Sequence, residues 1–418
     1  MIRTLALSAF LTAGSAFAQA PFSAPQTAAP APVAGQGLAA AGSSVSAAEP
    51  SSADLAAQSA PAAAQAPSPS LSWTRRWSFL QDAAKNGDYA GAESEMVDDL
   101  NLLASQNPDN ADAPQARFLA ASLEEREGLH DQAMVDLLHL LYEFPNADVS
   151  LQAQSMFQDI AKKRLPGRYK AAIASAAQAP SEASVSKRLA ALVHLLVQDF
   201  GAELYGATRS EIRGFMARFP DYSGMDQVQW DLSLLDQSAG NNRGALLGAQ
   251  EFLALYPQSA LAEKVQFALG SLYAQLGLYQ KAVGAYQSFT ADYPQSPDSV
   301  SALSQIAAIF AQHLDQYGMA VKTDEMIVSQ VSQGRPAAEA LYQEAGLYDC
   351  RFLFFSCKLD DPAKALSVYQ RIVDSGNLDF LDRKEAERVR SRINSLTAKQ
   401  AKEQAEAQQA AQPAAGSR

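Results

Sequence analysis

Apolar residues in the central part of the chain recur every three or four positions, which is the spacing of amphipathic helices. Residues 262–296 carry the clearest example, AEKVQFALGSLYAQLGLYQKAVGAYQSFTADYPQS. The pattern predicts two helices that turn at Gly277 and end at Pro294, because proline interrupts a continuing helix. Where the two helices press together we expect small and aromatic residues, namely Gly270, Tyr273, Ala282, Tyr286 and Phe289.

Parts of this hairpin recur at a fixed interval along the chain. Pro220, Pro257 and Pro294 are 37 residues apart, and so are Pro108 and Pro145. A glycine, an alanine five residues on and a proline twelve further occur three times: Gly128/Ala133/Pro145, Gly240/Ala245/Pro257 and Gly277/Ala282/Pro294. Because one such hairpin cannot bury its apolar face alone, the recurrence predicts an array of stacked neighbours.

These residues and spacings resemble the tetratricopeptide repeat (TPR), which carries Leu-Gly, Tyr, Ala, an aromatic residue and a terminal Pro at these places. The resemblance implies an all-α fold, an α-solenoid of about seven to eight TPR-like helix-turn-helix repeats over residues 73–396. The clearest repeats lie in residues 226–297. The period of 37 residues exceeds the ~34 of the standard repeat, so we expect lengthened helices or turns.

Two regions depart from the repeat pattern. In residues 181–220 the helical pattern is visible, but Gly201 and Gly206 do not match the expected turn. This segment is either a distorted repeat or a joint between two sub-arrays. Residues 382–396 predict an amphipathic, charged final helix that caps the open end of the array. Residues 397–418 form a polar tail, which we expect to be frayed helix or disordered.

The amino terminus has the pattern of an export signal. Arg3 supplies a positive charge, an apolar core follows, and Ala16-Phe17-Ala18 offers a small-residue cleavage site before Gln19. We therefore expect a signal peptide over residues 1–18, followed by a disordered linker rich in Ala, Pro and Ser over residues 19–72. No later stretch approaches the ~20 apolar residues of a membrane span. The mature protein is predicted to be exported and soluble, and periplasmic if the source has two membranes.

Charge and cysteine usage narrow the classes of partner and cofactor. The formal net charge is −12 with a pI near 4.9, and Lys and Arg form no long cluster. This argues against nucleic acid and against an anionic membrane surface as partners. The two cysteines, Cys350 and Cys357, predict a local disulfide in an oxidising compartment. A zinc site would need further His or Cys nearby, and the sequence has none there.

Signals for catalysis are weak. The four histidines are scattered, and no phosphate-binding glycine loop, nucleophile elbow or dinucleotide fingerprint is present. Ser184 and Lys187 match the Ser-x-x-Lys pattern, but its companion motifs are missing. We therefore predict that the chain is not an enzyme and has no catalytic residue, no metal site and no cofactor.

An aromatic residue stands ten positions before each of five turn glycines. The five residues are Trp77, Phe118, Phe157, Trp230 and Phe267. In TPR folds this position lies near the concave face, so two interpretations stay open. The rings either fill the gaps between stacked repeats, or some are partly open and form a groove that binds a helix or an extended peptide. Polar residues predicted to rim such a groove are Gln227, Gln237, Lys264 and Gln275.

The export signal and the Tyr-Pro-Gln-Ser endings resemble envelope TPR proteins of the BamD and YbgF kind, which are adaptors in outer-membrane assembly and in Tol-Pal-linked wall constriction. The chain lacks the anchor cysteine of the first kind and the coiled coil of the second. The resemblance implies a noncatalytic scaffold that binds envelope proteins through its concave face. The alternative is a peptidoglycan-binding accessory of wall or outer-membrane assembly.

Overall fold

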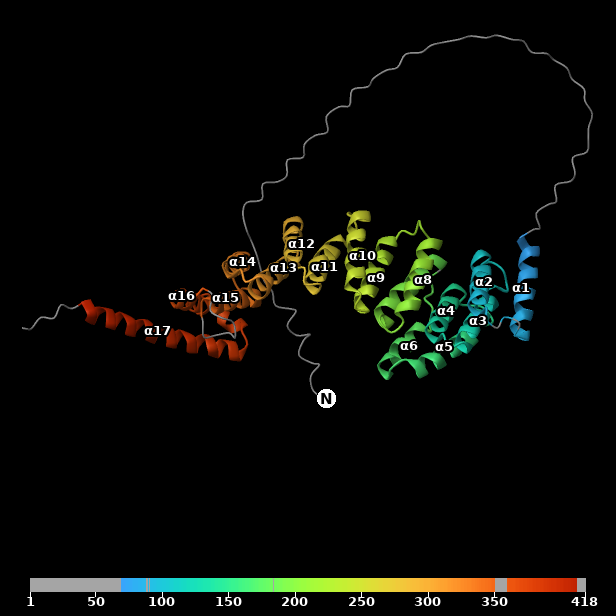
Figure 1. Cartoon of the computed structure of the whole chain (residues 1–418), viewed down its shortest axis with the longest axis horizontal. Coiled ribbons are helices and arrows are strands. Elements are labelled where there is room, and N and C mark those ends of the chain that lie inside the picture. Colours follow the sequence, from blue (N-terminus) through green and yellow to red (C-terminus); the bar gives the residue numbers. More distant parts are fainter. Residues whose placement is uncertain (1–68, 88, 90, 183, 350–358, 412–418) are drawn as a thin grey trace, which may run out of the picture. The chain divides into compact units, whose positions relative to one another are not determined.

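The computed structural model describes residues 69–87, 89, 91–182, 184–349 and 359–411 (Figure 1). The described residues form 17 α-helices joined by turns and short 3₁₀ or π segments. They belong to two compact units, one described over 69–87 and 89 and the other from 91 onward. The predicted signal peptide, the linker up to residue 68 and the predicted disulfide at Cys350 and Cys357 lie outside the described residues.

The first unit is described as a single helix, α1 (Pro69–Asn86). Its start at Pro69 suits proline, which is tolerated in the first turn of a helix where no backbone donor is required. The rings of Trp73 and Trp77 lie one turn apart on this helix, with centroids 6.5 Å from each other. Gly87 follows in the left-handed region with φ of 71°, a conformation that ends a helix and that glycine adopts without strain.

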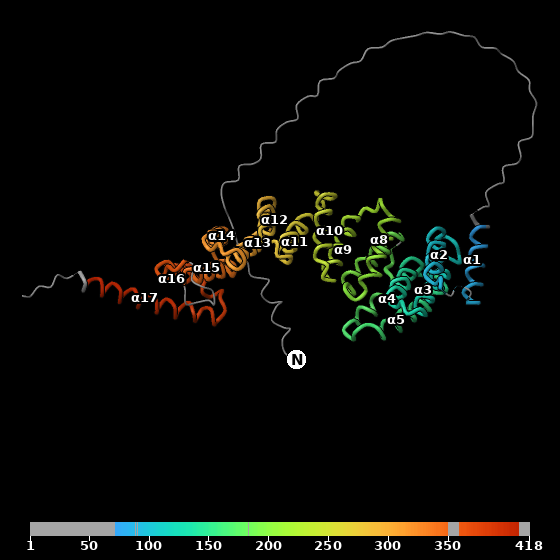
Figure 2. The backbone as a smooth tube through the Cα atoms, viewed as in Figure 1, coloured from blue at the N-terminus to red at the C-terminus, as the bar shows by residue number. Residues whose placement is uncertain are grey.

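In the second unit consecutive helices pack against each other from α2 to α6 and from α7 to α17. The order of the helices can be followed by the labels in Figure 1 and along the tube in Figure 2. The helices are α2 (Glu93–Gln106), α3 (Ala113–Arg126), α4 (His130–Glu143), α5 (Ser150–Arg164), α6 (Lys170–Ala176), α7 (Val185–Leu195), α8 (Tyr205–Arg218), α9 (Met225–Ser238), α10 (Asn242–Leu255), α11 (Ala262–Gln275), α12 (Tyr279–Asp292), α13 (Asp298–Ala308), α14 (Tyr317–Gln330), α15 (Arg335–Tyr348), α16 (Pro362–Asp374) and α17 (Arg383–Ala411). The pairs from α3/α4 to α15/α16 are hairpins, so the prediction of an all-α array of helix-turn-helix repeats is confirmed.

The predicted period appears directly in the helix bounds. Helices α9 and α11 begin 37 residues apart, at Met225 and Ala262, and so do α10 and α12. All four helices are 14 residues long. The turns between paired helices contain Gly128, Gly240 and Gly277, with φ of 81°, 78° and 71°. Only glycine adopts this left-handed conformation without strain, so the recurring glycine sets the sharp turn of each hairpin.

Within the hairpin of α11 and α12 the helices approach most closely at Gly270. A Cβ atom built on Gly270 would lie 2.6 Å from Cε1 of Tyr286, inside contact distance. Tyr286 is 1% exposed, and its hydroxyl is hydrogen bonded to Ser271 at 2.8 Å, which fixes the ring. Ala282 is fully buried on the same helix as Tyr286. The predicted packing of small residues against aromatic rings is therefore confirmed here.

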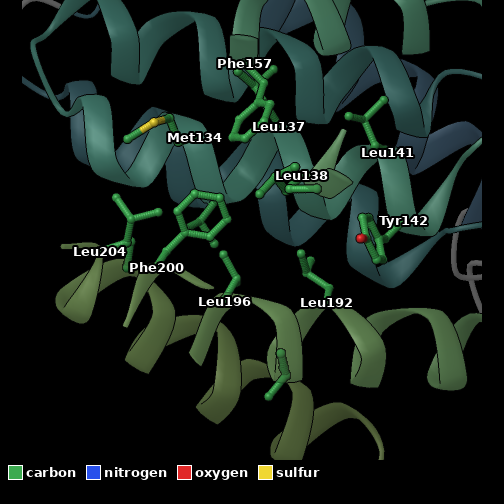
Figure 3. Packing of buried hydrophobic residues seen from close by; sticks show 14 of the residues in the cluster. Met134, Leu137, Leu138, Leu141, Tyr142, Phe157, Leu192, Leu196, Phe200 and Leu204 are labelled. Carbon is green, nitrogen blue, oxygen red and sulfur yellow. The ribbon is translucent and has the colours of Figure 1, made fainter. Parts of the chain in front are cut away.

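A continuous apolar core joins the hairpins from α4 to α9. Figure 3 shows its centre, where Leu137 and Leu138 of α4 lie between Phe157 of α5 and Leu192 and Leu196 from α7 and its extension. These side chains are each 2% exposed or less. Burying a leucine or phenylalanine in this way stabilises a fold by about 1.5–3 kcal/mol relative to an exposed side chain. The core thus makes neighbouring hairpins depend on one another.

The segment 181–220 is a hairpin of α7 and α8 with an unusual end to its first helix. A π-helical turn, η2 (Leu196–Phe200), extends α7, and Gly201 ends it with φ of 26°. Gly201 therefore ends the first helix of this hairpin, but the π-helical extension displaces it from the fixed glycine spacing of the other repeats. The preceding helix α6 has only 7 residues. As a result both α7 and α8 contact α4.

The final helix is longer than predicted. The sequence predicts a helix over residues 382–396 and a frayed or disordered tail from 397, whereas α17 runs continuously from Arg383 to Ala411. Arg392 holds its first part to the array by donating to both oxygens of Asp349 at 2.6 Å. The later part is rich in strong helix formers, and ion pairs between residues four apart, such as Lys399 with Glu403 at 3.6 Å, support it.

Two glycine substitutions in the same hairpin are expected to act in opposite directions. Gly270→Ala places a methyl group against the Tyr286 ring, and we expect it to destabilise the protein by about 1–3 kcal/mol through overpacking. Gly284→Ala in α12 meets nothing within 4 Å, and the gain in helix propensity stabilises the protein by up to about 1 kcal/mol. Thermal unfolding followed by circular dichroism checks both. Equal midpoints for the two variants would contradict the predicted contact.

Candidate functional site

The structure places the five predicted aromatic residues in different surroundings. Phe157 is fully buried and Trp230 is 2% exposed, and both belong to the cores between hairpins. Phe118 and Phe267 are partly buried and pack against those cores. Trp77 lies on α1 in the other unit. Phe157 and Trp230 therefore support the stacking of repeats in this conformation, and a role of Phe118 or Phe267 in partner binding stays a prediction.

The polar residues predicted to rim a groove are not gathered around one hollow. Gln227 is half-buried and donates to Asp231 on the same helix at 2.9 Å. Lys264 and Gln275 are exposed near opposite ends of α11. Gln237 is half-buried on α9. Their predicted role in binding a partner is untested by this arrangement.

A groove lies instead on the two most regular hairpins, over α10, α11 and α12. We call it the α10–α12 groove, and its volume is about 550 Å³. Its apolar walls are partly exposed side chains from α10, from α11 and from the residue after α12: Leu253, Leu269, Tyr273 and Tyr293. Between these walls the chain has small residues, Ala262, Gly284 and Ala285. Because a Cβ on Gly284 would meet nothing within 4 Å, the surface there is open.

Polar groups surround this groove and fix its walls. Gln250 donates to the hydroxyl of Tyr273 at 2.8 Å, and the ammonium of Lys281 lies 5.9 Å from the centre of the same ring. On the other side Gln266 donates to Asp292 at 2.7 Å. The groove therefore combines an apolar interior with a polar rim of both charges, which is the composition of surfaces that bind protein segments.

A second hollow, which we call the α2–α8 hollow, lies between α2, α3, α4 and α8 and has a volume of about 430 Å³. Buried charges form its base. The carboxylate of Glu143 on α4 lies 3.0 Å from Nε of Arg117 and accepts hydrogen bonds from Nε2 of His139, at 3.0 Å, and from Arg218. Nδ1 of His139 lies 2.8 Å from Glu211 of α8. This network ties three helices together.

The network sets the protonation of its members. Burial alone would raise the pKa of Glu143, but the hydrogen bond from His139 and the charge of Arg117 hold that pKa well below its usual range. Burial and the charge of Arg117 act to lower the pKa of His139, yet the carboxylates of Glu211 and Glu143 raise it overall. The arrangement therefore favours a positively charged imidazole between two carboxylates.

Glu124 of α3 lines the same hollow without such partners. Its side chain is 2% exposed, and among the described residues its Oε2 atom has no hydrogen-bond donor. Burial, followed by the negative charges of Asp136 and Asp98, raises the pKa of Glu124 to about 9. Removing a carboxylate from water without a partner costs free energy, so this group keeps its proton at neutral pH.

Neither hollow was predicted from the sequence, although one signal was available. Arg117 and Glu124 are seven residues apart on the buried stripe of α3, and Asp136, His139 and Glu143 share one face of α4. Charged residues at buried helical positions are uncommon, and they point to an internal ionic cluster. The histidines match no metal motif, whereas the helix period aligns His139 with Asp136 and Glu143.

Within the described residues, no three side chains of His, Cys, Asp or Glu are arranged so that they could hold a metal ion. None of the described helices combines the length and the apolar character that crossing a membrane requires.

Solved structures with a similar arrangement include repeat proteins. The chain is similar to a tetratricopeptide repeat protein from Parabacteroides merdae, with 12% identity and a TM-score of 0.28, over 62% of this chain and 94% of that one. It is also similar to the TPR domain of P58(IPK), with 13% identity and a TM-score of 0.25, over 79% and 99%. A circular tandem repeat protein matches with 12% identity and a TM-score of 0.19, over 80% and 91%. No protein-family model and no curated protein matches the chain.

Replacing the buried Glu124 by glutamine is expected to stabilise the protein, by an amount that increases with pH. Because the pKa of Glu124 rises from 4.5 to about 9 on folding, the wild-type protein loses stability as pH increases between these values, by up to about 1.4 kcal/mol per pH unit. Glu124→Gln removes this titration. We therefore expect its thermal midpoint to match the wild type near pH 4.5 and to exceed it increasingly towards pH 9.

Glu95→Gln serves as the control for this experiment, because Glu95 is exposed on α2. Surface substitutions of this kind change stability by less than about 0.5 kcal/mol. A constant difference between Glu124→Gln and the wild type across the pH range would contradict the predicted titration.

Proposed function

We propose that this chain is a noncatalytic scaffold that binds a segment of a partner protein in the α10–α12 groove. The observation that carries the proposal is the open apolar hollow on the most regular pair of hairpins, with Leu253, Leu269 and Tyr273 partly exposed in its walls. Outside the groove, α10 also exposes Leu247 and Leu255, which are 66% and 58% exposed. Exposed apolar surface of this kind with a polar rim is typical of protein interaction sites.

The array provides a rigid support for this groove. Its walls come from helices that are also fixed in the core, through Phe252, Val265 and Phe289, each fully buried. A partner would therefore bind a preformed surface and lose little free energy in ordering it. The walls are aliphatic and aromatic, so we infer that apolar side chains of the partner are the anchors.

The export pattern of residues 1–18 supports a partner in the cell envelope. We infer that the chain acts in the periplasm of a bacterium with two membranes. The resemblance to adaptors of the BamD and YbgF kind supports partners that take part in outer-membrane assembly or wall constriction. This part of the proposal depends on the sequence pattern and is tested separately from the groove.

A larger side chain in the α10–α12 groove is expected to prevent binding of the partner. Gly284→Leu places a branched side chain in the open space of the groove, whereas Gly284→Ala leaves most of that space free. We expect a crosslinking pull-down from the envelope fraction, with the full-length chain as bait, to recover a defined partner with the wild type and with Gly284→Ala. Gly284→Leu should recover at least tenfold less.

Both variants are expected to fold, since leucine and alanine favour a helix more than glycine does. Circular dichroism of the two proteins verifies this before the pull-down. Undiminished recovery with Gly284→Leu would move the binding surface away from the α10–α12 groove.

The export proposal predicts the mature amino terminus. In a host with two membranes, we expect the chain to be recovered from the periplasmic fraction with an intact mass that begins at Gln19. Leu7→Arg interrupts the apolar core of the signal and should leave the protein uncleaved in the cytoplasm. A wild-type chain that keeps residues 1–18 in the cytoplasm would refute export.

A further inference from the structure

The α2–α8 hollow presents buried acceptors that no donor of the described residues satisfies. They are Oε2 of Glu124 and Oδ1 of Asn101. Nε of Arg117 and Nη1 of Arg218 also have no hydrogen-bond acceptor among the described residues, but both guanidinium groups pair with Glu143. The amide nitrogen of Asn101 donates to Asp136 at 2.7 Å, so its amide oxygen must face elsewhere. Unsatisfied acceptors that line an open hollow are suited to a ligand that supplies N–H donors.

The charges around this hollow select the sign of that ligand. Arg117 and Arg218 of the lining both pair with the buried Glu143. The third basic residue of the lining, His139, lies between Glu143 and Glu211. The acidic residues of the lining outnumber the basic ones and are Glu93, Asp98, Glu124, Glu127, Asp136 and Glu211. Arg117 also acts on Asp136, but the carboxyl groups around Glu124 still outnumber the basic groups of the lining, so the hollow attracts a cation.

We propose that the α2–α8 hollow binds an organic cation, a primary ammonium or guanidinium group on an alkyl stem, through Glu124, Asn101 and Asp136. The hollow of about 430 Å³ is much larger than a bare metal ion needs. Val97 and Leu129 also line it and can cover the alkyl stem. The cation supplies donors to the two unsatisfied acceptors and a charge that the carboxyl groups compensate.

Binding of the cation includes a proton transfer to solvent. Free Glu124 holds its proton at neutral pH, and a cation beside it favours the carboxylate, so the O–H bond breaks and the proton leaves to the buffer. The negative charges of Asp136 on α4 and Asp98 on α2 act directly on Glu124. The other titratable or charged groups of the lining are Glu93 on α2, Arg117 on α3, Glu127 directly after α3, His139 on α4, and Glu211 and Arg218 on α8. Glu124 thus becomes a carboxylate, and a charged partner of the cation, only when the cation is bound.

Such a cation could be a free diamine or the side chain of a lysine or arginine in a bound protein, and the two share the same recognition chemistry. The hollow and the α10–α12 groove lie on different helices. Binding of a free diamine or of a protein side chain in the hollow can therefore be tested independently of partner binding in the α10–α12 groove.

Isothermal titration calorimetry on the full-length chain at pH 7 tests the site. The probes are 1,5-diaminopentane for the free cation, N-acetyl-lysine methylamide and N-acetyl-arginine methylamide for the side chains, and 1,5-pentanediol as a neutral analogue. We expect at least one cation to bind with one equivalent per chain and the diol not to bind. The heat should differ between phosphate and MOPS buffers because a proton is released.

Two variants locate the binding. Glu124→Gln should weaken binding of the cation at least tenfold and remove the dependence of the binding heat on the buffer. Gly214→Leu should weaken it as much, because Gly214 lines the hollow and a Cβ there meets nothing within 4 Å. Gly284→Leu, in the other groove, should leave the affinity unchanged.

The outcomes separate clearly. Binding of the diamine but not the amino-acid amides indicates a free cation, and binding of an amide indicates a protein side chain; both support the site. No binding of any cation, equal binding of the diol, or unchanged affinity in Glu124→Gln or Gly214→Leu overturns it. Glu124→Gln is expected to be the more stable protein, so a loss of binding there is not a loss of folding.

Discussion

The close approach of the two helices of each hairpin is the constraint on which the array depends. In α11 and α12, Gly270 accepts the ring of Tyr286 where any side chain would collide with it. In α9 and α10 the same problem has another solution, since Ser233 lies against Gly248 and donates to the carbonyl oxygen of Ala245 at 2.7 Å. Once a hairpin is closed in this way, its remaining apolar faces can be buried only by the next hairpin.

This dependence explains which parts of the fold were predictable. A left-handed turn needs glycine and a close helix contact needs a small residue, so Gly240 and Gly277 and their partners mark the hairpins in the sequence itself. The end of α7 was not predictable by the same rule, because a π-helical turn moved Gly201 away from the expected place. The length of α17 depends on helix propensity and local ion pairs, which a search for buried positions does not detect.

The candidate sites were harder to predict than the fold, because periodicity shows which face of a helix is apolar but not what covers it. Trp230 stands at the same repeat position as Phe267, yet it is 2% exposed, with the ring of Phe252 6.3 Å away. Phe267 packs against Tyr286 and Phe289, each 5.4 Å away, and stays partly exposed. The open space of the α10–α12 groove comes from the lack of a side chain at Gly284, and no motif reports such an absence.

The buried charges occur where the repeat is least regular. Because α6 is short, α8 reaches α4, and Glu211 and Arg218 meet His139 and Glu143 there. An ionic network of this kind contributes little net stability compared with apolar packing, and an unpaired carboxyl such as Glu124 reduces it. Irregularity in a repeat array therefore has a physical consequence: it brings together side chains from non-consecutive hairpins. The regular part of this chain can offer only a surface groove, whereas the irregular part can enclose charged groups that distinguish one ligand from another.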